Sequence, residues 1–138
     1  MVDAELRKKI TDFIVEKIDP DFIMLFGSQV TGETHAKSDT DLAFYKRDHQ
    51  LSPYDIFILS VELADIAKTN VDLIDLNIAS TVFKMQIFGY GEPLYITNQF
   101  EFDEYQMTAM SMYHNLDVER REILQAIIER GSVYGNTK

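Results

Sequence analysis

Hydrophobic and polar residues follow one another along the chain in blocks that predict helices and strands in turn. Residues 3–18 carry apolar side chains at the spacing of one helix face. Residues 22–26 form a short, continuous apolar run, which is typical of a buried strand. A second strand is predicted over 39–46, and a helix over 54–68 with Pro53 suited to its first turn. Apolar positions at helical spacing in this helix are Ile58, Val61, Leu63 and Ile66.

The second half of the chain continues this pattern. Because Pro93 has no N–H to give to a sheet ladder, the short strand that contains it is expected at a sheet edge. Alternating strands and helices predict an α/β fold, a sheet with helices packed on it. We expect one domain over residues 1–138, with 100–131 as a C-terminal helical extension. The later elements are a strand over 70–76, a helix over 79–88 closed by Gly89 and Gly91, a strand over 93–96 and a helical pattern over 100–130.

An apolar and aromatic stretch lies within this last helical region. It contains Tyr105, Met107, Met110 and Tyr113. Packing over the sheet is the simpler interpretation. A partner-binding surface is the alternative, because Met side chains suit adaptable interfaces.

Composition narrows the functions that such a fold could carry. The chain has no Cys, which excludes a disulfide framework and a thiolate metal site. A net charge of −10 argues against nucleic-acid binding through a basic groove, whereas it suits docking to a basic protein partner. Apolar runs are shorter than the roughly 18 residues of a membrane span, and the N-terminal residues lack the apolar core of a signal peptide. We therefore expect a cytoplasmic protein without a membrane segment.

The candidate chemistry lies between the first two predicted strands. Gly27 and Ser28 follow the first strand, where backbone N–H groups of a loop that opens a helix can hold a phosphate. Asp39 and Asp41 are two residues apart at the start of the second strand, so their carboxylates share one face. Adjacent carboxylates repel each other unless a cation lies between them, and Mg²⁺ prefers carboxylate and phosphate oxygens. A helix cap would account for Ser38 and Asp39, but not for Asp41 within a strand-like run.

From Gly27 to Leu42 the chain reads G-S-x-x-x-G-x-x-x-x-x-S-D-x-D-L. This pattern resembles the signature of the minimal nucleotidyltransferases, a family within the DNA polymerase β-like superfamily, and in particular the MntA-type antitoxins that pair with HEPN-domain toxins. The combined spacing of this motif is specific for the family. The resemblance extends over nearly the whole chain, but the C-terminal region contributes much less specific evidence for it. The defined positions, all present, are Gly27, Ser28, Gly32, Ser38, Asp39, Asp41 and Leu42.

The resemblance implies a fold and a site. The fold would be a small mixed sheet with helices mainly on one face and the active site on the open face. Asp39, Asp41 and a third carboxylate would be catalytic and would bind Mg²⁺, commonly two ions about 3.5–4 Å apart. ATP would be the substrate, held by Gly27, Ser28, Gly32 and Ser38.

Asp72 is our choice for the third carboxylate. Relatives of this fold supply that carboxylate from a neighbouring strand between apolar residues, and Val71-Asp72-Leu73 fits this description. Asp75 is the alternative. An odd step of three residues places Asp75 on the other face of the same strand, so we interpret it as a strand-end residue.

Three interpretations of function follow. The resemblance implies an enzyme that transfers AMP from ATP to a tyrosine hydroxyl of a partner HEPN ribonuclease toxin and thereby neutralises it. A nucleotidyltransferase acting on a small hydroxylated compound such as an antibiotic is the second interpretation, although such enzymes usually carry a larger second domain. An antitoxin that acts by binding alone is the third, and the intact G-S and D-x-D argue against it.

Substitutions in the phosphate loop test its predicted role. Gly27→Val should weaken ATP binding and AMP transfer strongly, because a β-branched side chain obstructs close approach and any positive φ. Ser28→Ala should do less harm, because the backbone N–H groups remain. Both variants are compared with wild type by ATP affinity and by incorporation of labelled AMP. Wild-type values for Gly27→Val would show that this loop does not hold the triphosphate.

Overall fold

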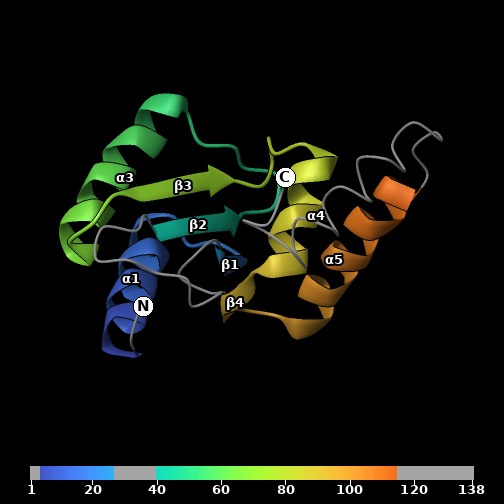
Figure 1. The fold of residues 1–138 in the computed structure, drawn as a ribbon, viewed down its shortest axis with the longest axis horizontal. Helices are drawn as coiled ribbons and strands as arrows, with labels where there is room; N and C mark the ends of the chain where they lie inside the picture. The colour runs from blue at the N-terminus through green and yellow to red at the C-terminus, as the bar shows by residue number, and fades with distance from the viewer. Residues whose placement is uncertain (1–3, 27–39, 115–138) are drawn as a thin grey trace, which may run out of the picture.

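The computed structural model describes residues 4–26 and 40–114, and within them the chain builds a four-stranded mixed sheet (Figure 1). The strands lie in the order β3-β2-β1-β4. β1 pairs antiparallel with β2 and with β4, whereas β2 and β3 are parallel. The strands are β1 (Phe22–Phe26), β2 (Thr40–Tyr45), β3 (Val71–Asp75) and β4 (Glu92–Ile96).

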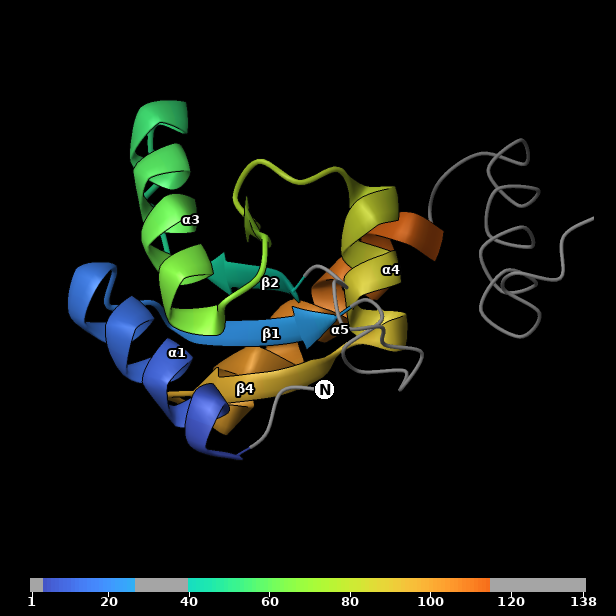
Figure 2. The same ribbon diagram turned by 60° about the vertical axis from the view of Figure 1, so that its left-hand side comes forward.

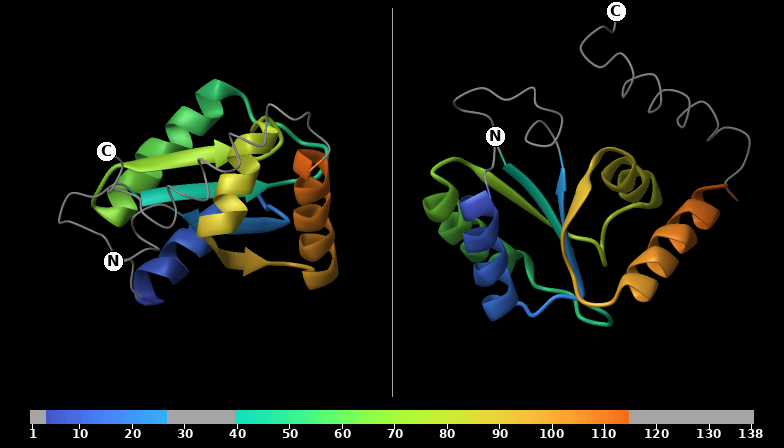
Figure 3. Two further views of the ribbon diagram at one scale, coloured as in Figure 1. Left: turned by 45° about the vertical axis from the view of Figure 1, so that its right-hand side comes forward. Right: turned by 90° about the horizontal axis from the view of Figure 1, so that it is seen from below.

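Helices lie against both faces of this sheet. α1 (Ala4–Lys17) and α3 (Pro53–Ala67) cover one face. α4 (Thr81–Tyr90) and α5 (Gln99–His114) pack against each other and lie on the other face, as the view from below in Figure 3 shows. The predicted small mixed sheet is confirmed. The expected distribution of helices is refined, because the second face is partly covered as well.

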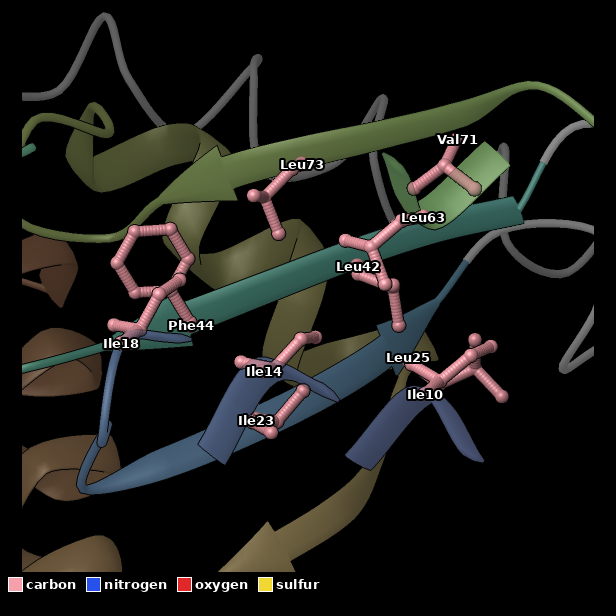
Figure 4. Close-up of a cluster of buried hydrophobic side chains, with 10 residues drawn as sticks. All are labelled: Ile10, Ile14, Ile18, Ile23, Leu25, Leu42, Phe44, Leu63, Val71 and Leu73. Carbon is pink, nitrogen blue, oxygen red and sulfur yellow. The ribbon is translucent and has the colours of Figure 1, made fainter. Parts of the chain in front are cut away.

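The face under α1 and α3 holds an aliphatic core. Ile10 and Ile14 of α1 and Leu63 of α3 are fully buried. Alternate residues of the three strands β1, β2 and β3 meet them, because successive side chains of a strand point to opposite faces. Figure 4 shows this cluster, whose buried members are Ile10, Ile14, Ile18, Ile23, Leu25, Leu42, Phe44, Leu63, Val71 and Leu73.

The opposite face holds an aromatic core. Phe22 of β1 lies at its centre, with the rings of Phe102 and Tyr105 at centroid distances of 4.9 Å and 5.4 Å. Phe88 of α4 joins the same group at 6.2 Å from Phe22. Edge-to-face and tilted ring pairs at such distances are favourable, so they hold α4 and α5 to the sheet.

Local signals in the sequence account for the ends of the helices. Ser52 and Ser80 are the N-caps of α3 and α4, and each hydroxyl accepts a bond from the backbone N–H three residues later, at 3.1 Å in both cases. α3 ends at Lys68, which has a left-handed backbone with φ 62°. α4 ends at Gly91, whose φ is −102°, so its need for glycine comes from close packing rather than from backbone conformation.

Most predicted elements match the structure within two residues at each end. β4, which contains Pro93, is an edge strand, as predicted. α4 runs through Gly89 to Tyr90, so only Gly91 closes it. None of the described helices is both long and apolar enough to cross a membrane. The loop and helix start predicted over 28–38 and the helical pattern beyond residue 114 lie outside the described residues.

Two groups of apolar residues are placed differently from the prediction. Ile58 and Val61 of α3 do not enter the core with Leu63; they are 37% and 53% exposed. In α5, Tyr105 joins the aromatic core and Tyr113 is buried, whereas Met107 and Met110 are exposed. Both helices are apolar around more of their circumference than one buried face requires, so spacing alone could not identify the buried side.

Two glycines at the C-terminal end of α4, Gly89 within the helix and Gly91 as its cap, give a matched test of packing. A Cβ on Gly91 would lie 2.6 Å from the Ile87 carbonyl oxygen and 2.9 Å from the Leu25 carbonyl oxygen. Gly91→Ala should therefore lower the free energy of unfolding by about 1–3 kcal/mol. Gly89 has nothing within 4 Å of that position, so Gly89→Ala should raise the free energy of unfolding by about 0.5–1 kcal/mol. Urea denaturation followed by circular dichroism measures both changes, and equal effects would contradict the prediction.

Candidate active site

The parallel pairing of β2 and β3 brings two of the predicted site residues together. Asp41 is the register partner of Asp72. Neighbouring strands lie about 4.8 Å apart, and register partners project to the same face. The two carboxylates therefore stand side by side on the face that carries α4 and α5. Asp72 is exposed and Asp41 is half-buried.

The rest of the predicted site belongs to the connection between β1 and β2. Phe26, the last residue of β1, is itself the register partner of Asp41. Both ends of the connection are thus held next to the carboxylate pair. The residues within it to which we assigned phosphate or metal binding lie outside the described residues: Gly27, Ser28, Gly32, Ser38 and Asp39.

The strands hold the carboxylates through apolar neighbours. The next residues on the same face, Ala43 of β2 and Ile74 of β3, belong to the core beneath α4 and α5. Residues on the opposite face, Leu42 and Leu73, are buried beneath α1 and α3. Asp41 and Asp72 are thus each the second residue of a strand whose following residues are packed on both faces of the sheet.

Asp75 has a different environment, which fits the interpretation as a strand-end residue. Its side chain lies on the face opposite to Asp72 and is 1% exposed. Its Oδ2 accepts a bond from Leu51 N–H at 3.0 Å, and its Oδ1 accepts one from Asn77 N–H at 2.9 Å. Asn77 Nδ2 in turn donates to the carbonyl oxygens of Lys46 and His49, both at 2.7 Å. Asp75 therefore stabilises the connection after β2.

The donor set fits a hard divalent cation. Two carboxylates that are direct neighbours in a sheet destabilise each other, and an oxygen-preferring cation between them relieves that repulsion. Within residues 4–26 and 40–114 no cluster of three His, Cys, Asp or Glu side chains is arranged to hold a metal ion. Asp41 and Asp72 are two of the three predicted ligands. The third, Asp39, directly precedes Thr40, the first residue of β2, in the sequence.

A wide groove adjoins the pair. It has a volume of about 890 Å³ and runs along the outer edge of β3, between α3 and the start of α4. Asp72 is one of its lining residues, so the groove leads to the carboxylates. In Figure 2, α3 and α4 stand on either side of this region. Residues that line the walls include Phe57, Ser60 and Val61 of α3 and Ile78, Ser80 and Phe83 beside or within α4.

Comparison with protein families now identifies the class of molecule. The family described as "Polymerase beta, Nucleotidyltransferase" matches residues 8–100, which include both strands that carry the carboxylates. The chain belongs to this nucleotidyltransferase family. Asp41 and Asp72 are therefore an acidic pair on a sheet of the fold that this family uses.

Individual relatives narrow the class. The chain is similar to the protein adenylyltransferase MntA of Shewanella oneidensis, with 35% identity over 106 residues that cover 77% of this chain and 75% of MntA. A crystal structure of a toxin–antitoxin with AMP-PNP contains a chain with 32% identity and a TM-score of 0.77, over 88% of this chain and 98% of that one. A structure of the tri-AMPylated S. oneidensis HEPN toxin with its MNT antitoxin has a TM-score of 0.73 at 29% identity, over 90% and 97% of the two chains.

Sequence reasoning did not find the groove. A weak signal was present, because Tyr54, Phe57, Ile58 and Val61 add a second apolar stripe to a helix that already has one. Only the sheet order, which leaves β3 at an edge, shows that this stripe lies on the same side of the sheet edge as the groove that leads to Asp72.

Replacing each of the two β3 aspartates by alanine separates a site residue from a structural one. Asp75→Ala leaves two backbone N–H groups without their acceptor and should lower the free energy of unfolding by about 2 kcal/mol or more. Asp72→Ala changes an exposed side chain and should alter stability by less than about 0.5 kcal/mol. It should nevertheless reduce nucleotide transfer by about 10²-fold or more. Chemical denaturation and labelled-AMP incorporation are measured on both variants, and wild-type transfer by Asp72→Ala would remove Asp72 from the site.

Proposed function

We propose that this nucleotidyltransferase is a Mg²⁺-dependent protein adenylyltransferase and antitoxin, which transfers AMP from ATP to a tyrosine hydroxyl of a HEPN ribonuclease toxin. The observation that carries the proposal is the register of Asp41 with Asp72 beside an open groove. The relatives add support, because the similar protein of S. oneidensis is named a protein adenylyltransferase and a related MNT antitoxin is seen with an AMPylated HEPN toxin. A cytoplasmic location is part of the proposal, because ATP is the donor.

The reaction is a displacement at the α-phosphorus of ATP. The tyrosine oxygen forms a bond to this phosphorus, the bond from the phosphorus to the bridging β-phosphate oxygen breaks, and pyrophosphate leaves with the electron pair. The proton of the phenol passes to a carboxylate, and the exposed Asp72 is the candidate base. A phenol suits this role, since its unperturbed pKa of about 10 is far below that of an aliphatic hydroxyl.

The predicted metal ligands are Asp39, Asp41 and Asp72, and the predicted nucleotide contacts are Gly27, Ser28, Gly32 and Ser38. Bound Mg²⁺ supplies charge that stabilises the attacking and leaving oxygens. The chain's own part is to hold the carboxylates in fixed register, which the two cores on either side of β2 and β3 achieve.

The groove favours a protein acceptor over a small compound. Its walls carry exposed aromatic and aliphatic side chains, which suit a protein segment better than a polar antibiotic. Inhibition by binding alone is the alternative function, and a variant without the aspartate pair separates it from catalysis.

Intact-mass measurements test the proposal. The protein is incubated with Mg²⁺, ATP and its HEPN partner, and we expect AMP additions on a tyrosine of the partner. The control is Asp39→Asn with Asp41→Asn, which should abolish the additions while the thermal midpoint stays unchanged or rises, because repulsion between carboxylates is relieved. An unmodified partner that the double variant still silences would favour inhibition by binding alone.

A further inference from the structure

The outer side of α3 carries an apolar stripe that lies outside both cores formed by the described residues. Phe57 is 63% exposed and Val61 is 53% exposed, and Tyr54 and Ile58 extend the stripe by one turn spacing each. Phe57 and Val61 line the groove beside β3, and Ile78 on the opposite wall is 55% exposed. We call this region the β3 groove. Exposed apolar side chains grouped around one hollow are typical of an interaction site.

The floor of the β3 groove is the outer edge of a strand. β3 is at the end of the sheet order, so only β2 pairs with it among the described strands. In a parallel pair, alternate residues of a strand direct both their N–H and C=O groups to the same neighbour. Thr40 N–H donates to Asn70 C=O and Leu76 N–H to Phe44 C=O, each at 2.9 Å. The even-numbered residues thus face β2, and Val71 and Leu73 direct their backbone N–H and C=O groups toward the groove. Asp75 also directs its N–H there, whereas its C=O already accepts a bond from Ile78 N–H at 3.1 Å.

Charge around the β3 groove has one sign. Among the described residues, the charged side chains that line the groove are Asp72 and Asp75, and Asp75 is buried. The other lining residues are apolar or uncharged, and the whole chain carries a net charge of −10. An apolar groove with a carboxylate on its floor, in an acidic protein, fits a segment that has apolar side chains at its centre and basic residues beside them.

We propose that the β3 groove binds an extended segment of the toxin partner, which pairs with the edge of β3 and carries the acceptor tyrosine. This inference rests on the proposed function, and it adds where the acceptor docks. Strand addition at an open edge supplies main-chain hydrogen bonds, while pockets beside the edge select alternate side chains.

The geometry of strand pairing explains how the acceptor tyrosine would reach the carboxylates of Asp72 and Asp41. Side chains of an added strand project to the same two faces as those of β3. A tyrosine opposite Asp72 would project to the face on which Asp72 and Asp41 lie. The neighbouring residues of the segment would project to the other face, toward Phe57 and Val61 of α3. One bound segment would thus place its hydroxyl at the carboxylates and its apolar side chains against the stripe.

Kinetics with the full-length protein, Mg²⁺, ATP and the toxin test this docking mode. The variant is Phe57→Ala with Val61→Lys, which removes apolar area and adds a charge unfavourable to a basic partner. We expect the KM for the toxin to rise about tenfold or more, with the KM for ATP and the kcat within about twofold of wild type. The matched control is Phe100→Ala with Met107→Lys, because these α5 residues are 73% and 68% exposed and lie outside the groove.

Each kinetic outcome decides the question. A raised toxin KM in the groove variant alone supports the proposal. Equal effects in both variants, or none, would overturn it. A raised KM for ATP with an unchanged KM for the toxin would show that the groove belongs to the donor nucleotide. If wild-type protein transfers no AMP to the toxin, the proposed function fails, and docking is then judged by hydrogen exchange alone.

Hydrogen–deuterium exchange at the backbone amides of β3 measures binding of the toxin segment independently of AMP transfer. Adding the toxin to the full-length protein should slow exchange at Val71, Leu73 and Asp75, and the groove variant should lose this protection. Protection that is already present in the free protein, and lost when residues 115–138 are removed, would show that the chain's own C-terminal region occupies the groove. Protection that grows with the concentration of the protein alone would indicate a second copy of the chain. Either result would overturn the assignment to the toxin.

Discussion

The parallel pairing of β2 with β3 is the constraint on which the candidate active site depends. It sets Asp72 opposite Asp41, although 30 residues and the whole of α3 separate them along the chain. A shift of one residue would turn every side chain of β3 to the other face, and would replace Asp72 by an apolar neighbour. Burial opposes such a shift, because Val71 and Leu73 must remain beneath α3.

Placing two carboxylates in register has an energetic cost, and the surrounding core offsets it. Phe44 and Leu42 on one face of β2 and Ala43 on the other are fully buried, while Asp41 and Tyr45 are half-buried. Such burial contributes roughly 1.5–3 kcal/mol for each large side chain, whereas a pair of like charges across a sheet costs about 1 kcal/mol or less. The fold can therefore keep the acidic pair together without a bound cation, as the proposed Mg²⁺ site would require.

Sequence patterns were sufficient where a single local signal decided the structure. The apolar run of β1, the proline of the edge strand β4 and Pro53 at the start of α3 each act within a few residues, and the elements they indicate are present. The choice of Asp72 over Asp75 also followed from strand parity. The structure places Asp72 beside Asp41 and buries Asp75 in bonds to Leu51 and Asn77, while the catalytic role of Asp72 stays a prediction.

By itself, the sequence determined which residues could do chemistry, because the types and spacing of Gly27, Ser28, Asp39 and Asp41 are local properties of the chain. Tertiary structure alone decided which residues meet and which remain outside the core. Ile58 and Val61 have the same hydrophobic character as Leu63, yet they face the groove while Leu63 is buried. The reason is physical: α3 presents one side to the sheet, and the strand order leaves β3 at an edge with its backbone directed outward. Neither property is contained in the spacing of residues along α3.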